Sequence, residues 1–269
     1  MEQTSCLKQK RLFLFDIDGT IAIDTNLLDG TRELLQYIES VGGKAIYITN
    51  NSTKSIKDYI AKFQRWNIQT DASNFITSSY AMGIYLKEHY PKETIYVLGT
   101  KSFVKELRDF NLNVTEKPEK SVKCVVVGFD NELNYDKITD VCMLLETRKT
   151  EYLATNMDYA CPTSFGFIPD CGAICRMIEC AVRRQPKFIG KPNPCIVDMC
   201  LEQTGFQKEE TIVIGDRLYT DIACGINAGV DTAVVFTGEA CREDMKKTPY
   251  QATWCFDTIQ DFYREIKTL

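Results

Sequence analysis

Histidine is almost absent from this chain, since His89 is the only one among 269 residues. A zinc site built from three histidines is therefore impossible within one chain, and so is a phosphatase mechanism that needs two. A Ser/His/Asp triad would have to use this single ring. His89 follows an amphipathic segment and precedes Tyr90 and Pro91, which is typical of a surface or helix-end residue. The composition therefore favours chemistry by carboxylates, lysine, hydroxyls or thiols.

Long apolar runs and an excess of positive charge are also missing. No apolar stretch approaches the ~20 residues that a membrane-spanning helix needs. The opening residues MEQTSCLKQKRLFLFDIDG lack the cleavage pattern of a signal peptide. Lys and Arg total 32 against 37 Asp and Glu, whereas a general nucleic-acid binder carries a basic face. We therefore expect a cytoplasmic protein with no nucleic-acid partner and no membrane partner.

Cysteine, in contrast, is abundant, with twelve residues. No Cys-x-x-Cys pair is present, so the spacing does not suggest a zinc knuckle. Cys124 and Cys142 lie in apolar segments, where a thiol behaves as a small hydrophobic side chain. Cys142 and Arg148 match the C-x5-R spacing of cysteine phosphatases, but the segment between them has the composition of an amphipathic helix. We expect reduced thiols without a catalytic role.

Apolar runs typical of buried strands alternate with amphipathic segments typical of helices along the whole chain. This alternation predicts an α/β fold of right-handed βαβ units with parallel sheets. The expected strands cover 12–18, 44–50, 94–99, 124–129, 151–156, 211–216 and 232–238. The expected helices cover 26–41, 53–66, 101–110, 134–147, 171–185, 194–204, 218–228 and 258–268.

Reactive side chains follow the expected strands only near the two ends of the chain. The middle, about 80–183, has strands of its own but no such strand ends. The length allows one or two domains at about 150 residues each. We therefore predict a Rossmann-like parallel-sheet core formed by residues 1–79 and 184–269, with a second domain inserted at 80–183.

Four clusters of polar residues lie at or near the ends of strands in the predicted core. They are DIDGT (16–20), TNNS (49–52), GKP (190–192) and GDRLYTD (215–221). Ligands of open parallel sheets bind beyond the carboxyl ends of the strands, so we expect the clusters to converge. Crowded carboxylates raise one another's pKa unless a cation neutralises them. Oxygen ligands beside a substrate phosphate suit Mg2+.

These residue types predict phosphoryl chemistry. A carboxylate beside Mg2+ can attack phosphorus and form an aspartyl-phosphate. A second carboxylate two residues along can protonate the leaving oxygen and then activate water. Lysine and hydroxyl groups would bind the phosphoryl oxygens, where charge must be stabilised in the transition state.

Each cluster also has a purely structural interpretation. Asp-x-Asp-Gly can form a turn, and Lys191 can be a solvated surface residue. The segment TNNS (49–52) can cap the following helix, a role compatible with phosphate binding because a helix N-terminus favours an anion. Asp221 can complement the first turn of its helix through the dipole. The presence of all four clusters in these positions favours a functional site.

DIDGT, ITNNS, GKPNP and GDRLYTDI, in this order, resemble the four motifs of the haloacid dehalogenase (HAD) superfamily. The long insertion between TNNS and GKP resembles that of its subclass IIA, the NagD-like or p-nitrophenyl-phosphatase-type branch. The resemblance covers essentially the whole chain. It implies a HAD core with an inserted α/β cap of the C2 type, and a Mg2+-dependent phosphomonoesterase activity.

The resemblance also implies a role for individual residues. Asp16 would be the nucleophile and Asp18 the general acid/base. Phosphate would be bound by Thr49, Asn50 and Lys191. Mg2+ would be held by Asp16, the Asp18 carbonyl and Asp216, with Asp221 acting nearby through water.

The middle segment resembles the cap of that branch at VVVGFD (125–130) and ATNMD (154–158). Its loop MDYACPTSFGFIPDCGA (157–173) would face the leaving group, with Asn156 and Asp158 as specificity candidates, although such residues more often fix a loop. PDCGA departs from the P-G-x-G-A of relatives. Because a cap occludes bulky phosphates, we expect a small phosphorylated metabolite. Nucleoside monophosphates, sugar or glycerol phosphates, phosphoglycolate and pyridoxal phosphate all stay open.

Two other functions are compatible with these motifs. One is phosphotransferase or mutase chemistry on the same fold, and the other is a non-catalytic regulator that binds a phosphorylated metabolite. Dehalogenation is disfavoured because it needs neither an acid such as Asp18 nor a metal ligand such as Asp216. The exposed face of the cap is the surface on which a homodimer would form, but the sequence does not determine the oligomeric state.

Overall fold

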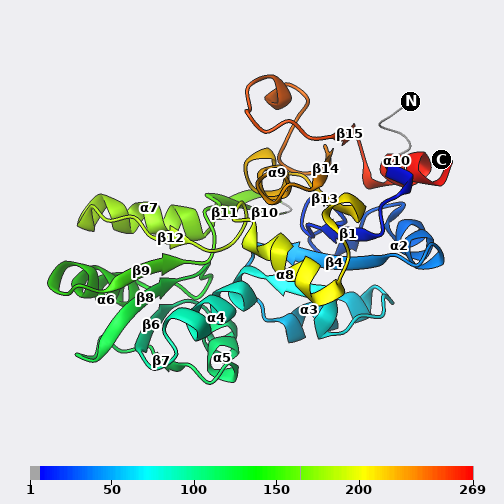
Figure 1. The fold of residues 1–269 in the computed structure, drawn as a ribbon. Helices are drawn as coiled ribbons and strands as arrows, with labels where there is room; N and C mark the ends of the chain where they lie inside the picture. The colour runs from blue at the N-terminus through cyan, green and yellow to red at the C-terminus, as the bar shows by residue number, and fades with distance from the viewer. Residues whose placement is uncertain (1–6, 164, 269) are drawn as a thin grey trace.

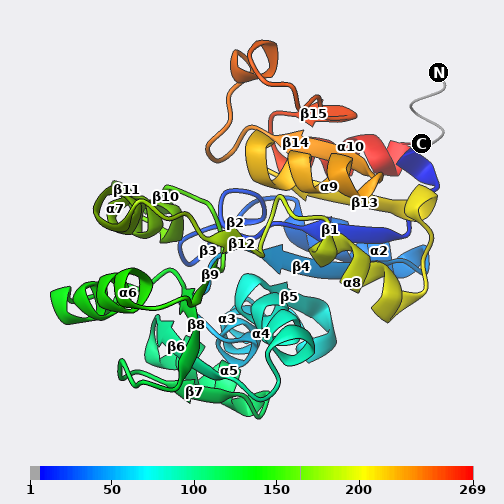
Figure 2. The same ribbon diagram turned by 60° about the vertical axis from the view of Figure 1, so that its left-hand side comes forward.

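The computed structural model describes residues 7–163 and 165–268, and within these ranges the chain forms two parallel sheets flanked by helices (Figures 1 and 2). The first sheet has the order β15-β14-β13-β1-β4-β5. Its strands are β1 (Leu12–Phe15), β4 (Lys44–Thr49), β5 (Phe75–Thr77), β13 (Thr211–Gly215), β14 (Asp231–Val235) and β15 (Trp254–Phe256). β1 therefore pairs with strands from both ends of the chain, β4 and β13.

The central strand β1 shows why this sheet is covered on both faces. All four residues of LFLF are buried, and successive side chains of a strand point to opposite faces. Leu12 and Leu14 pack in one apolar cluster, and Phe13 and Phe15 pack in another. The Phe cluster includes side chains of α2 (Thr31–Ser40), α3 (Ile56–Arg65) and α10 (Ile259–Thr268). The Leu cluster includes side chains of α4 (Ser78–His89), α8 (Cys195–Thr204) and α9 (Ala223–Ala228).

The middle of the chain forms the second sheet, in the order β12-β9-β8-β6-β7. Its strands are β6 (Thr94–Leu98), β7 (Asn113–Thr115), β8 (Val122–Val127), β9 (Glu151–Ala154) and β12 (Lys187–Phe188). The helices α6 (Tyr135–Thr147) and α7 (Cys171–Val182) share an apolar cluster with this sheet. α5 (Lys101–Asp109) instead packs in the cluster that also contains Leu12 and Leu14 of β1. One apolar cluster therefore runs from the first sheet to the second.

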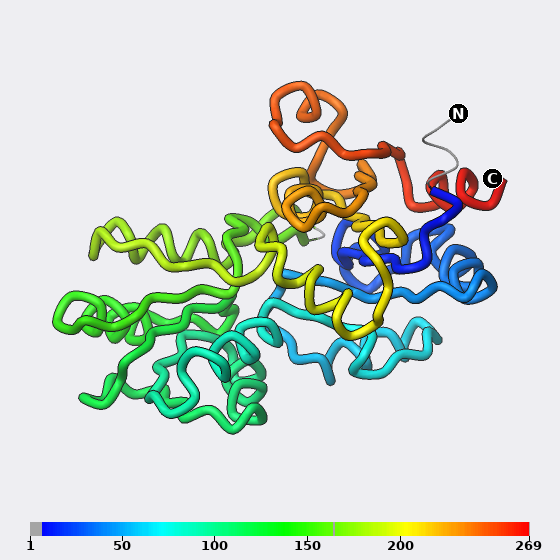
Figure 3. The backbone as a smooth tube through the Cα atoms, in the orientation of Figure 1, coloured from blue at the N-terminus to red at the C-terminus, as the bar shows by residue number. Residues whose placement is uncertain are grey.

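A short antiparallel hairpin, β10 (Ala160–Thr163) and β11 (Gly166–Pro169), lies between the second sheet and the first (Figure 1). The tube in Figure 3 shows the chain leaving the part that contains the first sheet in cyan and returning to it in yellow-green. No helix in the described part of the chain is long and apolar enough to cross a membrane. The eleven cysteines at positions 7–163 and 165–268 are free thiols.

The α/β class and the alternation of elements are confirmed, but several boundaries differ from the expected ones. The helix expected from residue 26 begins at Thr31, because β3 (Asn26–Leu27) pairs with β2 (Ala22–Ile23) in a hairpin. The helix expected from residue 53 begins at Ile56, after the cap formed by Ser55. The helix expected at 218–228 starts as a π-helical turn, η3 (Leu218–Ile222).

The sheet to which β12 belongs differs from the one that the sequence predicts. It falls in the range 184–269 that we predict as core, yet it pairs in parallel with β9 of the second sheet. Its two residues, Lys187 and Phe188, are too few to show a pattern that would assign them to either sheet. The loop that follows β12 carries Lys191 back to the first sheet.

Candidate active site

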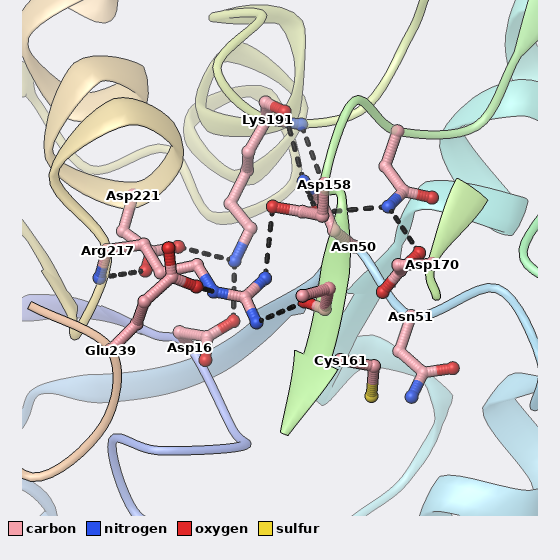
Figure 4. A network of polar contacts seen from close by, with 12 residues as sticks. Asp16, Asn50, Asn51, Asp158, Cys161, Asp170, Lys191, Arg217, Asp221 and Glu239 are labelled. Carbon is pink, nitrogen blue, oxygen red and sulfur yellow. Dashed lines mark hydrogen bonds and ion pairs between the residues drawn. The ribbon is translucent and has the colours of Figure 1, made fainter. Parts of the chain in front are cut away.

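Four segments bring their polar side chains together at the carboxyl ends of β1, β4 and β13. Asp16 follows β1, Thr49 ends β4, and Asp216 follows β13. Lys191 enters from the loop after β12, and Figure 4 shows its side chain extending to Asp16 and Asp221. Because β1 lies between β4 and β13, Asp16 occupies the centre of the group. The expected convergence of the four motifs is therefore present.

Lys191 neutralises part of a buried acidic cluster. Its Nζ donates to Asp16 Oδ1 at 2.6 Å, to Asp221 Oδ1 at 2.7 Å and to the Ile48 carbonyl at 3.0 Å. Burial alone would lower the pKa of Lys191, but the charges of Asp16 and Asp221 outweigh burial and raise it. Lys191 is thus held as a buried ammonium group, and an ammonium binds a phosphoryl oxygen as a point charge.

The carboxylates around Lys191 still carry more negative charge than it neutralises. Burial, followed by the charges of Asp221 and Asp216, raises the pKa of Asp16 against the opposing effect of Lys191. Burial and the charge of Asp221 raise the pKa of Asp216 to about 7. Carboxylates in this state favour an additional cation, because a nearby positive charge stabilises their ionised forms.

Asp16, Asp216 and Asp221 fit a divalent metal ion. One carboxylate oxygen from each lies within 4.8 Å of the others, and all three residues are buried. Such an all-oxygen donor set is the kind that Mg2+ uses together with substrate phosphate. Gly19 allows the close approach of its loop to Asp216, since a Cβ on it would lie 2.7 Å from Asp216 Oδ2. The Asp216 carboxylate is also fixed by the Glu239 amide, which donates to Oδ2 at 2.7 Å.

Asp18 lies apart from this carboxylate cluster. Its Oδ1 lies 2.9 Å from Nζ of Lys62, a side chain of α3. The Asp18 side chain is 27% exposed and lines a narrow cavity of about 20 Å³ together with Asp16, Thr49, Asn50 and Lys191. Asp18 also lines a larger adjoining cavity of about 440 Å³. It therefore lies where the narrow cavity beside Asp16 meets the larger one.

Thr49 and Asn50 are both buried, as expected of residues inside a site. The Thr49 hydroxyl accepts from the Asn51 amide at 3.2 Å. The Asn50 side chain binds the main chain of Lys191 in both directions, accepting from its amide at 2.9 Å and donating to its carbonyl at 3.0 Å. Asn50 Nδ2 also donates to Asp158 Oδ2 at 2.7 Å. Asn50 therefore joins the first sheet, the Lys191 loop and the segment 154–158.

Asp158 is the centre of a polar network that crosses between the two sheets (Figure 4). Besides Asn50, it accepts from Asn156 Nδ2 at 3.0 Å and forms an ion pair with Arg217 Nη1 at 3.0 Å. Asn156 Nδ2 also donates to Asp170 Oδ1 at 2.9 Å. Asn156 and Asp158 are both fully buried. Their contacts are those of residues that fix a loop, although Asp158 also lines the narrow cavity.

Arg217 is a site residue that was not singled out from the sequence, although it lies inside GDRLYTDI. Its side chain pairs with Glu239 at 2.8 Å as well as with Asp158, and it donates to the Ala160 carbonyl at 3.1 Å. A charged residue between two motif aspartates was a signal that could have identified it. Lys62 was also missed, and its place on an amphipathic helix gave no comparable signal.

Comparisons with known proteins agree with this geometry. A family model described as haloacid dehalogenase-like hydrolase matches residues 13–113, and a HAD-hydrolase-like model matches residues 188–262. These ranges contain all four motifs. The chain belongs to the haloacid dehalogenase-like hydrolases, and within them to the NagD-like phosphatases of subclass IIA.

Individual relatives match over nearly the whole chain. Proteins named acid sugar phosphatase from Staphylococcus epidermidis and Staphylococcus aureus are 31% and 32% identical, each over 97% of this chain and 100% of the relative. The structure of 4-nitrophenylphosphatase from Thermotoga maritima is 32% identical, with a TM-score of 0.90 over 97% of this chain and 99% of that one. NagD from E. coli is 28% identical, with a TM-score of 0.83 over 94% and 98%.

Proposed function

We propose that the protein is a Mg2+-dependent phosphomonoesterase that acts through an aspartyl-phosphate on Asp16. The convergence of Asp16, Asp216 and Asp221 around the buried ammonium of Lys191 carries this proposal. A site of this charge composition can hold both a divalent cation and a phosphate group. When bound, Mg2+ would supply the positive charge that keeps the carboxylates ionised and draws in the substrate phosphate.

The first half of the proposed reaction uses Asp16 and Asp18. An Asp16 carboxylate oxygen attacks phosphorus, and the bond from phosphorus to the leaving oxygen breaks. Asp18 gives its proton to that oxygen, which departs as an alcohol. Thr49 and Lys191 bind the phosphoryl oxygens, and Lys191 does so by exchanging one of its three present acceptors for the phosphate. Asn50 contributes through its main chain, because its side-chain amide is already bonded to Lys191 and Asp158.

The second half of the reaction regenerates the enzyme. A water molecule attacks the phosphorus of the aspartyl-phosphate, and the ionised Asp18 takes a proton from that water. Inorganic phosphate leaves and Asp16 is restored. We propose that Mg2+ would be held directly by the carboxylates of Asp16 and Asp216 and by the main-chain carbonyl of Asp18. Asp221 would contact the metal ion through a water molecule.

We propose a small sugar phosphate as the substrate and residues 80–183 as a cap over the site. Hydroxyl and amide side chains line the cavity of about 440 Å³ beside Asp18, and they come from segments next to both sheets. They include Thr25, Asn51, Asn131 and Thr237. The hydroxyl and amide groups in this lining match a polyhydroxylated leaving group. The naming of two relatives as acid sugar phosphatases supports the same class.

The test is hydrolysis of p-nitrophenyl phosphate and of a sugar-phosphate panel, with and without Mg2+. Asp16→Asn should abolish release of phosphate, whereas Asp257→Asn, at a 68% exposed side chain, should keep wild-type turnover. Undiminished turnover in Asp16→Asn would refute the assignment of the nucleophile. Product analysis with an added alcohol separates hydrolysis from phosphoryl transfer, because a hydrolase releases inorganic phosphate in either case.

A further inference from the structure

The proposed general acid has a cationic partner that the four motifs do not contain. Lys62 lies on α3, and its Nζ is 2.9 Å from Asp18 Oδ1. The Lys62 side chain is only 6% exposed, whereas Lys57 on the same helix is 80% exposed. A lysine is rarely buried to this extent without a specific partner. Its partner here is Asp18, 44 positions away along the chain.

The neighbours of Lys62 restrict its position. Its ammonium lies 5.0 Å from the centre of the Trp66 ring, within the range of a cation–π interaction. The Trp66 indole in turn donates to the Thr25 carbonyl at 2.7 Å, in the turn between β2 and β3. Lys62 is thus fixed between its own helix and the hairpin that directly follows the DIDGT motif.

The Asp18–Lys62 ion pair lies at the boundary between the two cavities. Asp18 lines both the narrow cavity that contains Asp16 and the larger one, whereas Lys62 lines the larger one. With Asp16 as the proposed nucleophile, a substrate bound across the two cavities would have its leaving oxygen next to this pair. With Oδ1 held on Lys62, the second carboxylate oxygen of Asp18 is left to exchange a proton with that leaving oxygen.

We propose that Lys62 is a positioning residue that holds Asp18 in the orientation for protonating poor leaving groups. This inference rests on the proposed roles of Asp16 and Asp18. Lys62 keeps its own protons throughout: the proton that reaches the leaving oxygen comes from Asp18 and returns to Asp18 from water. The effect of Lys62 therefore depends on how strongly the leaving oxygen needs a proton.

The experiment compares p-nitrophenyl phosphate with phenyl phosphate, two substrates of similar shape. A nitrophenolate leaves readily without protonation, while phenolate is the poorer leaving group. The value of kcat/KM reports the step in which the leaving group departs. A displacement of about 1 Å in a catalytic group can cost on the order of 100-fold. We expect Lys62→Met to lower kcat/KM for phenyl phosphate by at least about tenfold more than for p-nitrophenyl phosphate.

Three further variants make the result specific. Lys62→Arg should restore most of the phenyl phosphate activity, because it keeps a cation near Asp18. Lys57→Met, which removes an exposed lysine from the same helix, should leave both activities unchanged. Lys62→Gln keeps a polar side chain without the charge, and it repeats the test if the Met variant does not fold, as judged by circular dichroism.

The outcomes separate this inference from the proposed function. Equal losses on the two substrates in Lys62→Met or Lys62→Gln would overturn the positioning role and leave Lys62 as a structural residue. If Asp18→Asn shows the selective loss and the Lys62 variants do not, the inference fails while the proposed function stands. Activity retained by Asp16→Asn would instead refute the proposed function itself.

Discussion

Replacing Asp158 by Asn tests whether the polar network between the two sheets stabilises the folded protein. Asn has nearly the same size, so the change removes a charge without opening a cavity. The Asp158 carboxylate is fully buried, accepts from Asn50 and Asn156, and pairs with Arg217. An Asn that keeps its oxygen toward Asn50 and Asn156 would direct its N–H2 group at Arg217, which is itself a donor.

The magnitude follows from the contacts that are lost. Breaking a buried ion pair costs about 3–5 kcal/mol when a charge is left without a partner. Arg217 keeps Glu239 at 2.8 Å and the Ala160 carbonyl at 3.1 Å, so we take the lower end, about 3 kcal/mol. For a chain of this size, each kcal/mol corresponds to about 2–4 °C in Tm. We therefore expect a decrease of roughly 6–12 °C.

The assay is thermal unfolding followed by circular dichroism, with Asp257→Asn as the matched control. Asp257 also pairs with an arginine, Arg242, at 2.7 Å, but both side chains are well exposed. Exposed pairs contribute about 1 kcal/mol or less, so its Tm should fall by no more than about 4 °C. The KM for p-nitrophenyl phosphate should also rise in Asp158→Asn, because Arg217 loses its partner and both residues line the narrow cavity. Equal decreases in Tm for the two variants would refute the reasoning.

Three other predictions concern charge in and near the site. Burial, and next the charge of Asp158, raise the pKa of Asp170 to about 7, so the folded protein binds this proton more tightly than the unfolded chain. Protonated Asp170 therefore stabilises the folded protein at low pH, and this stabilisation is lost as pH rises toward about 7. The Tm of Asp170→Asn minus that of wild type should increase between pH about 5 and about 8. A difference in Tm that stays constant with pH would contradict this. Mg2+ at 100 times its Kd should stabilise the metal-free protein by about 2.7 kcal/mol and so raise its Tm. An equal rise in Tm for Asp216→Asn would argue against the proposed metal site. Lys191→Met should lower kcat/KM for p-nitrophenyl phosphate by on the order of 100-fold or more, because a preorganised partner of the phosphoryl oxygens is lost; a change below about threefold would show that Lys191 is dispensable.

Much of the fold and of the core motifs could be predicted because their signals are local. The apolar run Leu12–Phe15 alternates between two faces, and both faces are buried in the structure. Asp16, Thr49 and Asp216 each lie at the end of such a strand, and parallel pairing places those ends side by side. Because β4, β1 and β13 are neighbours in the sheet, the residues at their ends lie close together.

Element boundaries were harder to predict where a few residues had competing partners. Asn26 and Leu27 fit the pattern of the following helix but pair instead with Ala22 and Ile23. Lys187 and Phe188 lie close in sequence to the returning core but add an edge strand to the second sheet. Segments of two residues have too little periodicity to choose between such partners.

By itself, the sequence determined the α/β class, the motifs and the residue types that can carry phosphoryl chemistry, because these depend on short-range patterns. The tertiary structure decided which distant side chains meet those motifs. Asp18 pairs with Lys62, and Asn50 binds Asp158 across 108 positions of the chain. Such pairs form when helices and loops pack, and burial makes their partners specific, because a buried charge or amide must be satisfied. The single histidine is 44% exposed and lies at the end of α4, away from the candidate site, whose side chains are carboxylates, amides, the Thr49 hydroxyl, Lys191 and Arg217.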